Sequence, residues 1–295
     1  MELYVQEQVN LKVIFMIFTD GAVCPGTGGA FGGPYPGFTE PSAPGESNKE
    51  LLVNTHLTVF KEQVEAAQEF GPTLVNSHSL KDYFTEEMAA EFFSKALDWQ
   101  EEKGYRVLHE THRKRFLYSP WVARSFVPKF PGLEMVGDIS HWINVCETNT
   151  DDTDLTKVVE DLATRFTHVH CRVGYDHGPQ VPDPRVKEWI GYMEGHERWW
   201  DKIWMEADKK GDMEVTFTPE HGPPNYQVCD PNTKKPLSSI WDVNHWIGLR
   251  RQERFAELFG AENTSKLIPS STQGFEPRTK PGPSILEGKE NISFK

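Results

Sequence analysis

Six short apolar runs recur along the chain, and five segments whose apolar residues have helical spacing lie between or after them. The runs cover residues 12–19, 73–77, 105–111, 133–140, 166–173 and 213–220, and the helical segments cover 56–70, 85–103, 154–165, 188–210 and 243–259. Strands that alternate with helices predict a parallel sheet covered by helices. Each run stays apolar almost to its last residues, as expected of a strand buried on both faces.

Polar residues end four consecutive runs, and this favours a barrel over an open sheet, because barrel active sites form at the C-terminal ends of strands. A complete barrel has eight strands, whereas this sequence predicts six. Only about ten residues precede the first run, and each βα unit needs about 30. We therefore predict an α/β TIM (β/α) barrel over residues 1–262 whose first two βα units are lacking or atypical.

The C-terminal residues 263–295 are rich in Pro, Ser, Thr and Lys. This composition predicts an extended or disordered arm rather than a part of the barrel.

The charge of the chain restricts its partners. Its 295 residues include 31 basic and 44 acidic side chains, a formal charge of −13. Such an excess repels nucleic-acid backbones and anionic lipid, and no apolar run is long enough to span a bilayer. The four cysteines lie far apart without a Cys-x-x-Cys pair, so we expect reduced thiols and a cytoplasmic protein that binds neither nucleic acid nor a membrane.

Four strand ends carry the chemistry. They read His-Glu-Thr-His-Arg at 109–113, Asp-Ile-Ser-His at 138–141, His-Val-His at 168–170 and Pro-Glu-His-Gly at 219–222. Charged side chains inside a barrel are costly unless a cation neutralises them. One divalent ion, Mn²⁺, Mg²⁺, Co²⁺ or Zn²⁺, suits a set of three oxygen ligands and one nitrogen ligand, here Glu110, Asp138, His170 and Glu220. The alternative is four independent polar residues, each capping the helix that follows.

These motifs resemble the xylose-isomerase-like TIM barrels of sugar isomerases and epimerases, of which endonuclease IV is a distant relative. The resemblance extends over about residues 12–262 and makes the first predicted strand equivalent to the family's third. It implies that the family's metal ligands, a Glu, an Asp, a His and a Glu, fall on Glu110, Asp138, His170 and Glu220. It also implies that His141 contacts the substrate or a further metal ion.

The resemblance implies isomerisation or epimerisation of a sugar or a polyhydroxy ketone through an enediolate, which a metal ion stabilises. Glu110 and Glu220 are then the acid/base pair that moves the proton. Proton return to the other face of the carbon gives an epimer, return to the adjacent carbon gives an isomer, and the sequence favours neither. The candidate substrate-binding residues are His78, His112, His141, Arg172 and His177, for which packing at strand ends and turns is the alternative.

Two other functions stay open. An endonuclease IV-like hydrolase would use several metal ions, with His78, His112 and His141 as spare ligands. A non-catalytic barrel that serves as a binding protein would fit a chain with too few strands. The expected partner is a small sugar-like molecule, and a homodimer is implied by the resemblance alone.

Overall fold

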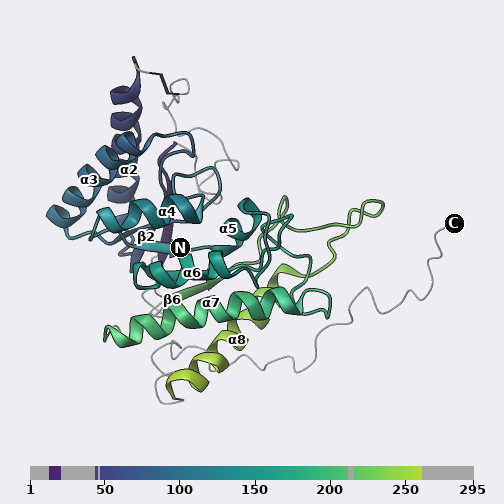
Figure 1. Cartoon of the computed structure of the whole chain (residues 1–295). Helices are drawn as coiled ribbons and strands as arrows, with labels where there is room; N and C mark the ends of the chain where they lie inside the picture. The colour runs from purple at the N-terminus through teal and green to yellow at the C-terminus, as the bar shows by residue number, and fades with distance from the viewer. Residues whose placement is uncertain (1–12, 21–43, 46, 212–215, 261–295) are drawn as a thin grey trace.

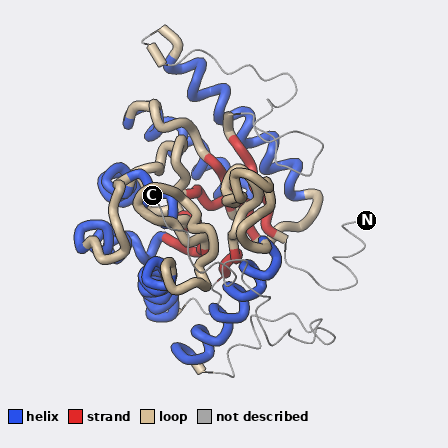
Figure 2. Tube along the Cα trace, turned by 90° about the vertical axis from the view of Figure 1, so that its right-hand side faces the viewer, coloured by secondary structure: helices blue, strands red, loops and turns tan. Residues whose placement is uncertain are grey.

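The computed structural model describes residues 13–20, 44–45, 47–211 and 216–260. These residues form an α/β fold around one sheet of six parallel strands whose order in space follows their order in the chain. Figure 2 shows the strands in the middle of the molecule with the helices outside them. The strands are β1 (Ile14–Phe18), β2 (Leu74–His78), β3 (Val107–Glu110), β4 (Met135–Gly137), β5 (Phe166–Cys171) and β6 (Thr216–Pro219).

This arrangement confirms the predicted fold class, a TIM-type barrel in partial or atypical form. Strands that lie in chain order and are joined by helices are the repeating unit of such barrels. The four inner strands are buried almost throughout, whereas β1 and β6 are mostly half-buried. Within the described ranges, β1 and β6 each pair with one neighbouring strand.

Five helices lie where the spacing of apolar residues predicts them, and Figure 1 shows how they cover the sheet. They are α2 (Lys49–Gln68), α3 (Glu86–Lys103), α6 (Thr153–Leu162), α7 (Ile190–Lys209) and α8 (Ile240–Phe259). The helix predicted from residue 56 in fact begins at Lys49.

Two short helices were not predicted, namely α4 (Pro120–Phe126) and α5 (Ile139–Val145), and short 3₁₀ turns follow α4 and α6 at Val127–Lys129 and Ala163–Arg165. The predicted strand at 133–140 is therefore too long. It ends at Gly137, because Asp138 caps α5 by accepting a hydrogen bond from the Ser140 backbone N–H, 3.1 Å away.

The two faces of the sheet differ in their packing. Most buried apolar side chains lie in one core between the sheet and the helices. A separate small cluster, Leu74, Leu108 and Val136, comes from three adjacent strands, with Ile14 of β1 against it. Side chains alternate along a strand, so the residues two and four positions further along these strands lie on the same face as this cluster. After Leu74 and Leu108, those positions carry the polar side chains Asn76, His78, Glu110 and His112, which are described below.

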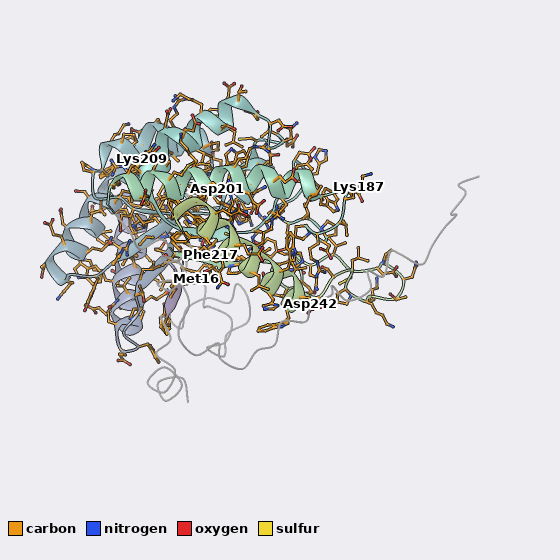
Figure 3. All side chains as sticks on the ribbon, turned by 90° about the horizontal axis from the view of Figure 1, so that it is seen from below. Met16, Lys187, Asp201, Lys209, Phe217 and Asp242 are labelled. Carbon is orange, nitrogen blue, oxygen red and sulfur yellow. The ribbon has the colours of Figure 1, made fainter. Side chains whose placement is uncertain are left out.

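Charged groups fix α8 against α7. The fully buried Arg251 donates a hydrogen bond to Asp201 over 3.1 Å and lies over the rings of Trp200 and Trp204. Figure 3 labels Asp201 midway along α7, close to where α8 crosses it.

Several sequence-based expectations fall wholly or partly outside the described ranges. The arm at 263–295 and the segment at 1–12 lie outside them, as does Cys24; the other three cysteines are free. Among the helices that the structure describes, none combines the length and the apolar character needed to cross a membrane.

Candidate functional site

The polar strand ends meet at one end of the sheet because consecutive parallel strands all end there. Glu110 is the last residue of β3. Asp138 directly follows β4, His170 lies near the end of β5, and Glu220 directly follows β6. Each of these four adjacent strands thus contributes one candidate metal ligand at the same end of the sheet.

The carboxylates of the other three residues lie around the imidazole of His170. Its Nδ1 lies 2.9 Å from Glu220 Oε2 and 3.7 Å from Glu110 Oε2. Ligand atoms of Asp138, His170 and Glu220 all lie within 4.8 Å of one another. Burial lowers the pKa of His170, but Glu220 and Glu110 outweigh it and raise this pKa to about 9.

Two residues of β2 hold Glu110 in place. His78 Nε2 lies 2.9 Å from Glu110 Oε2, and the Asn76 side-chain amide donates a hydrogen bond to the same oxygen. Burial raises the pKa of Glu110, yet the neighbouring His78 and His170 hold it well below its usual range. Asn76 was not predicted as a site residue, although it lies two positions before His78 and so shares its face of the sheet.

Two hydrogen bonds with Thr111 hold the backbone of Asp138 in place. Its backbone N–H donates to Thr111 Oγ1 over 2.9 Å, and the Thr111 hydroxyl donates to the Asp138 carbonyl over 3.0 Å. Full burial, together with the charges of Glu220 and Glu110, raises the pKa of Asp138, although Arg172 opposes this. The carboxylates of Glu110, Asp138 and Glu220 therefore repel one another, and nearby positive charge is needed to stabilise their ionised forms.

Arg172 supplies part of that charge. Its guanidinium donates to Asp138 Oδ2 over 3.3 Å, to Glu220 Oε1, and to Gln180 Oε1 over 3.0 Å. It also lies over the ring of Tyr226, 4.2 Å from the centroid. Burial raises the pKa of Glu220, but Arg172 and His170 outweigh it and lower this pKa to about 2.

Hydrogen bonding distinguishes the two histidines of β5. His168 uses both ring nitrogens within the sheet, with Thr216 Oγ1 at 2.8 Å and Thr218 Oγ1 at 3.1 Å. The Nδ1 of His170 is not bonded within the sheet and instead faces Glu220 Oε2, 2.9 Å away. His170, rather than His168, therefore directs a ring nitrogen toward the carboxylates.

Three imidazoles form one wall of the site. The rings of His78 and His112 are 4.5 Å apart, and those of His112 and His141 are 3.9 Å apart. Burial, with a contribution from His78, lowers the pKa of His112 to about 3. Burial and His112 hold the pKa of His141 well below its usual range. The rings of His112 and His141 are therefore neutral at pH 7.

Tyr226 joins this wall to the carboxylates, and the sequence did not single it out. Its hydroxyl lies 3.3 Å from His112 Nε2, and the guanidinium groups of Arg172 and Arg113 both lie over its ring. It belongs to the loop after β6, where no periodic pattern fixes the direction of a side chain.

The remaining predicted substrate contact, His177, lies apart from these groups. Its side chain is 74% exposed and its Nε2 is 3.5 Å from Asp176. Of the nine predicted site positions, the structure brings together the other eight.

The donor set fits a divalent cation. Three carboxylates and one imidazole are ligands that Mn²⁺, Mg²⁺, Co²⁺ and Zn²⁺ accept. Three buried polar atoms at this place, His170 Nδ1, Glu220 Oε2 and His141 Nε2, have charge contacts with each other or with Asp138 but no well-directed hydrogen bond. Native interiors rarely leave buried polar atoms without a hydrogen bond. Arg172 contacts the other oxygen of Glu220, so it leaves Oε2 available.

Comparison with known proteins gives distant likeness to solved structures alone. No protein-family model matches the sequence, and no curated protein matches it. Among solved structures, one similar fold is that of a D-tagatose 3-epimerase-like protein, with 15% sequence identity and a TM-score of 0.45 over 73% of each chain.

Proposed function

We propose that this protein is a metal-dependent isomerase or epimerase of a sugar or related polyhydroxy ketone, which acts by proton transfer through an enediolate. The observation that carries the proposal is the convergence of Glu110 and Glu220 on His170 Nδ1, at 3.7 and 2.9 Å, with Asp138 beside them. The sequence motifs at the same four strand ends support the same chemistry.

Four residues would hold the metal ion: Glu110, Asp138, His170 and Glu220. When bound, a divalent ion supplies positive charge that polarises a carbonyl group and stabilises a developing oxyanion. The His170 ring must lose its proton to act as a ligand, since ligands bind metal in their deprotonated form.

Glu110 and Glu220 are the residues that we assign to proton transfer. Both carboxylates are ionised at neutral pH, which a group that accepts a proton from a C–H next to a carbonyl must be. Asn76 and His78 orient Glu110, whereas Arg172 orients Glu220. Two bases held by different partners can remove and return a proton at different positions, which is what epimerisation and isomerisation require.

A hydrolase with several metal ions is the second candidate. The residues that favour it form two further groups of potential ligands, His78 with Glu110 and His112, and Glu110 with Asp138 and His141. The number of ions bound per chain separates the two candidates. One ion supports the isomerase, and two or three support the hydrolase.

Elemental analysis of the purified chain tests the metal site. We expect about one divalent ion per chain in the wild-type protein and none in the Glu110→Ala/Asp138→Ala double variant. The matched control is Glu257→Ala on α8, whose side chain is 64% exposed and pairs with Arg254. Equal metal content in the wild-type protein and the double variant would contradict the site.

Deuterium exchange tests the reaction. The protein is incubated in D₂O with a panel of ketoses, keto acids and cyclic polyhydroxy ketones, and deuterium next to the carbonyl is measured by mass spectrometry. We expect incorporation with at least one compound, and its loss in Glu220→Gln. If Glu220→Gln exchanges as fast as the wild-type protein, Glu220 is not one of the two bases.

A further inference from the structure

We propose that the substrate carries an anionic group, a carboxylate or a phosphate, and that Arg113 binds it with the help of Tyr226 and His112. This inference rests on the proposed function, and it narrows the substrate from sugars in general to sugar acids or sugar phosphates.

The first observation is that Arg113 lacks an anionic partner among the residues that the structure describes. Nine of the eleven arginines within the described ranges form an ion pair with a carboxylate. The two others in that part of the chain are Arg165 and Arg113. Arg165 donates to the backbone carbonyls of Phe130 and Pro131. Arg113 instead contacts His141 Nδ1 at 3.3 Å.

A half-buried guanidinium without a carboxylate partner does not stabilise the fold, but it is suited to bind an anionic ligand. Partial burial removes water from the charge without providing a counter-charge, which is unfavourable. An anionic ligand would supply that charge through the planar fork of N–H groups, which fits carboxylate and phosphate oxygens. Arg172 cannot serve equally, because Asp138, Glu220 and Gln180 already accept its N–H groups.

The second observation is the position of Arg113 relative to the carboxylates. One imidazole ring separates them, since His141 Nδ1 contacts Arg113 and His141 Nε2 lies 3.4 Å from Asp138 Oδ2. A ligand with its carbonyl at the carboxylates can therefore reach Arg113 with a group a few bonds away. That distance suits a short polyhydroxy chain with a charged end.

The third observation concerns access. Glu110, Asp138 and His170 are buried, whereas His112, Arg113, Glu220 and Tyr226 are half-buried. The side of the site that solvent reaches is thus the side that Arg113 and Tyr226 form. The Arg113 guanidinium lies over the Tyr226 ring, 5.1 Å from its centroid, and this contact fixes its direction.

Binding of three matched probes tests the inference. Erythronate, erythritol 4-phosphate and erythritol are titrated by calorimetry into the full chain, after chelation and again with Mn²⁺. We expect at least one anionic probe to bind about tenfold tighter than erythritol or better, as a charge-assisted hydrogen-bonded pair allows. A preference for erythronate indicates a sugar acid, and a preference for erythritol 4-phosphate indicates a sugar phosphate.

Variants assign this preference to Arg113. In Arg113→Gln the advantage of the anionic probe should disappear while the Kd of erythritol stays unchanged, and Arg113→Lys should retain part of it. Arg165→Gln, which removes the other arginine without a carboxylate partner, is the matched control and should behave as the wild-type protein.

The inference is overturned if erythritol binds as tightly as both anions, if none of the three binds, or if Arg113→Gln weakens all probes equally. The chelated samples keep this result separate from the proposed function. Loss of metal binding or of deuterium exchange would overturn that function and leave the preference for an anion standing.

Discussion

At the scale of single residues, Arg172 controls the balance of charge in the site. It is almost fully buried and donates to two carboxylates that are themselves buried or largely so. An ion pair in such a place adds little net stability, but removing one partner leaves uncompensated charges in a medium of low polarity.

Replacing Arg172 by Gln should therefore destabilise the metal-free protein by about 3–5 kcal/mol, the usual cost of breaking a buried pair. Added Mn²⁺ should stabilise the variant more than the wild-type protein, because the ion would replace the lost charge. Urea unfolding in EDTA and in Mn²⁺ measures both effects.

The control for this prediction is Arg106→Gln. Its pair with Glu134 is exposed, with the two side chains 44% and 39% accessible, so the change should cost less than about 1 kcal/mol. An Arg172→Gln variant as stable in EDTA as the Arg106→Gln variant would show that the site does not depend on this charge.

Residue-level prediction from the sequence worked where a polar residue ends an apolar run. Glu110, Asp138, His170 and Glu220 satisfy that rule, and the structure brings them together. Tyr226 does not, because its place over Arg172 depends on the path of a loop. Which roles these residues have stays a prediction that the experiments above address.

At the scale of elements, long periodic segments were predictable and short ones were not. All six strands and five helices lie where the apolar pattern indicates. The helices α4 and α5 have seven residues each, about two turns, which is too short for a period of 3.6 to show. The sequence signal for α5 is a cap, Asp138 followed by Ser140, within a run that also resembles a strand.

Helix α7 depends on close contact at one glycine. A Cβ atom built on Gly195 would collide with the side chain of Thr150, which precedes α6. Gly195→Ala should therefore push α7 away from this loop and cost about 1–3 kcal/mol, as overpacking of a filled interior does. The free energy of unfolding in urea measures this effect.

Gly191 in the first turn of the same helix is the matched control. Nothing lies within 4 Å of a Cβ built there, so Gly191→Ala should leave stability unchanged or raise it slightly, because Ala favours helix more than Gly does. If Gly195→Ala proves equally harmless, α7 is free to shift and the contact with Thr150 does not position it.

At the scale of the whole molecule, the site is a product of the order of strands. Each βα unit contributes one or two groups that are far apart in sequence, and the parallel sheet brings their ends together. The sequence predicts this convergence because strand direction and order follow from the alternation of strands and helices. It could not predict which nitrogen or oxygen each group presents, since that depends on packing between distant segments.

The stability of the whole fold should also depend on pH through His196, a fully buried residue of α7. Its Nδ1 lies 2.8 Å from the Tyr192 carbonyl, and its Nε2 accepts a hydrogen bond from the Gly174 N–H over 3.3 Å. Both nitrogens are thus used by the neutral ring. Burial lowers the pKa of His196 from 6.5 to about 4.

A histidine whose pKa is lowered by folding stabilises the native state only while it stays neutral. The unfolded chain takes up a proton below about pH 6.5, whereas the folded protein does not until about pH 4, so stability falls as pH decreases through this window. At about 1.4 kcal/mol for each pKa unit, the loss from this one residue should approach about 3 kcal/mol. In His196→Gln, the free energy of urea unfolding should fall less steeply between pH 6.5 and 4 than in the wild-type protein, even though the variant is less stable at pH 7.

The exposed His245 of α8 provides the control, because His245→Gln should keep the wild-type dependence of the unfolding free energy on pH. Parallel curves for the wild-type protein and His196→Gln would mean that His196 takes up its proton in the folded state as readily as in the unfolded chain.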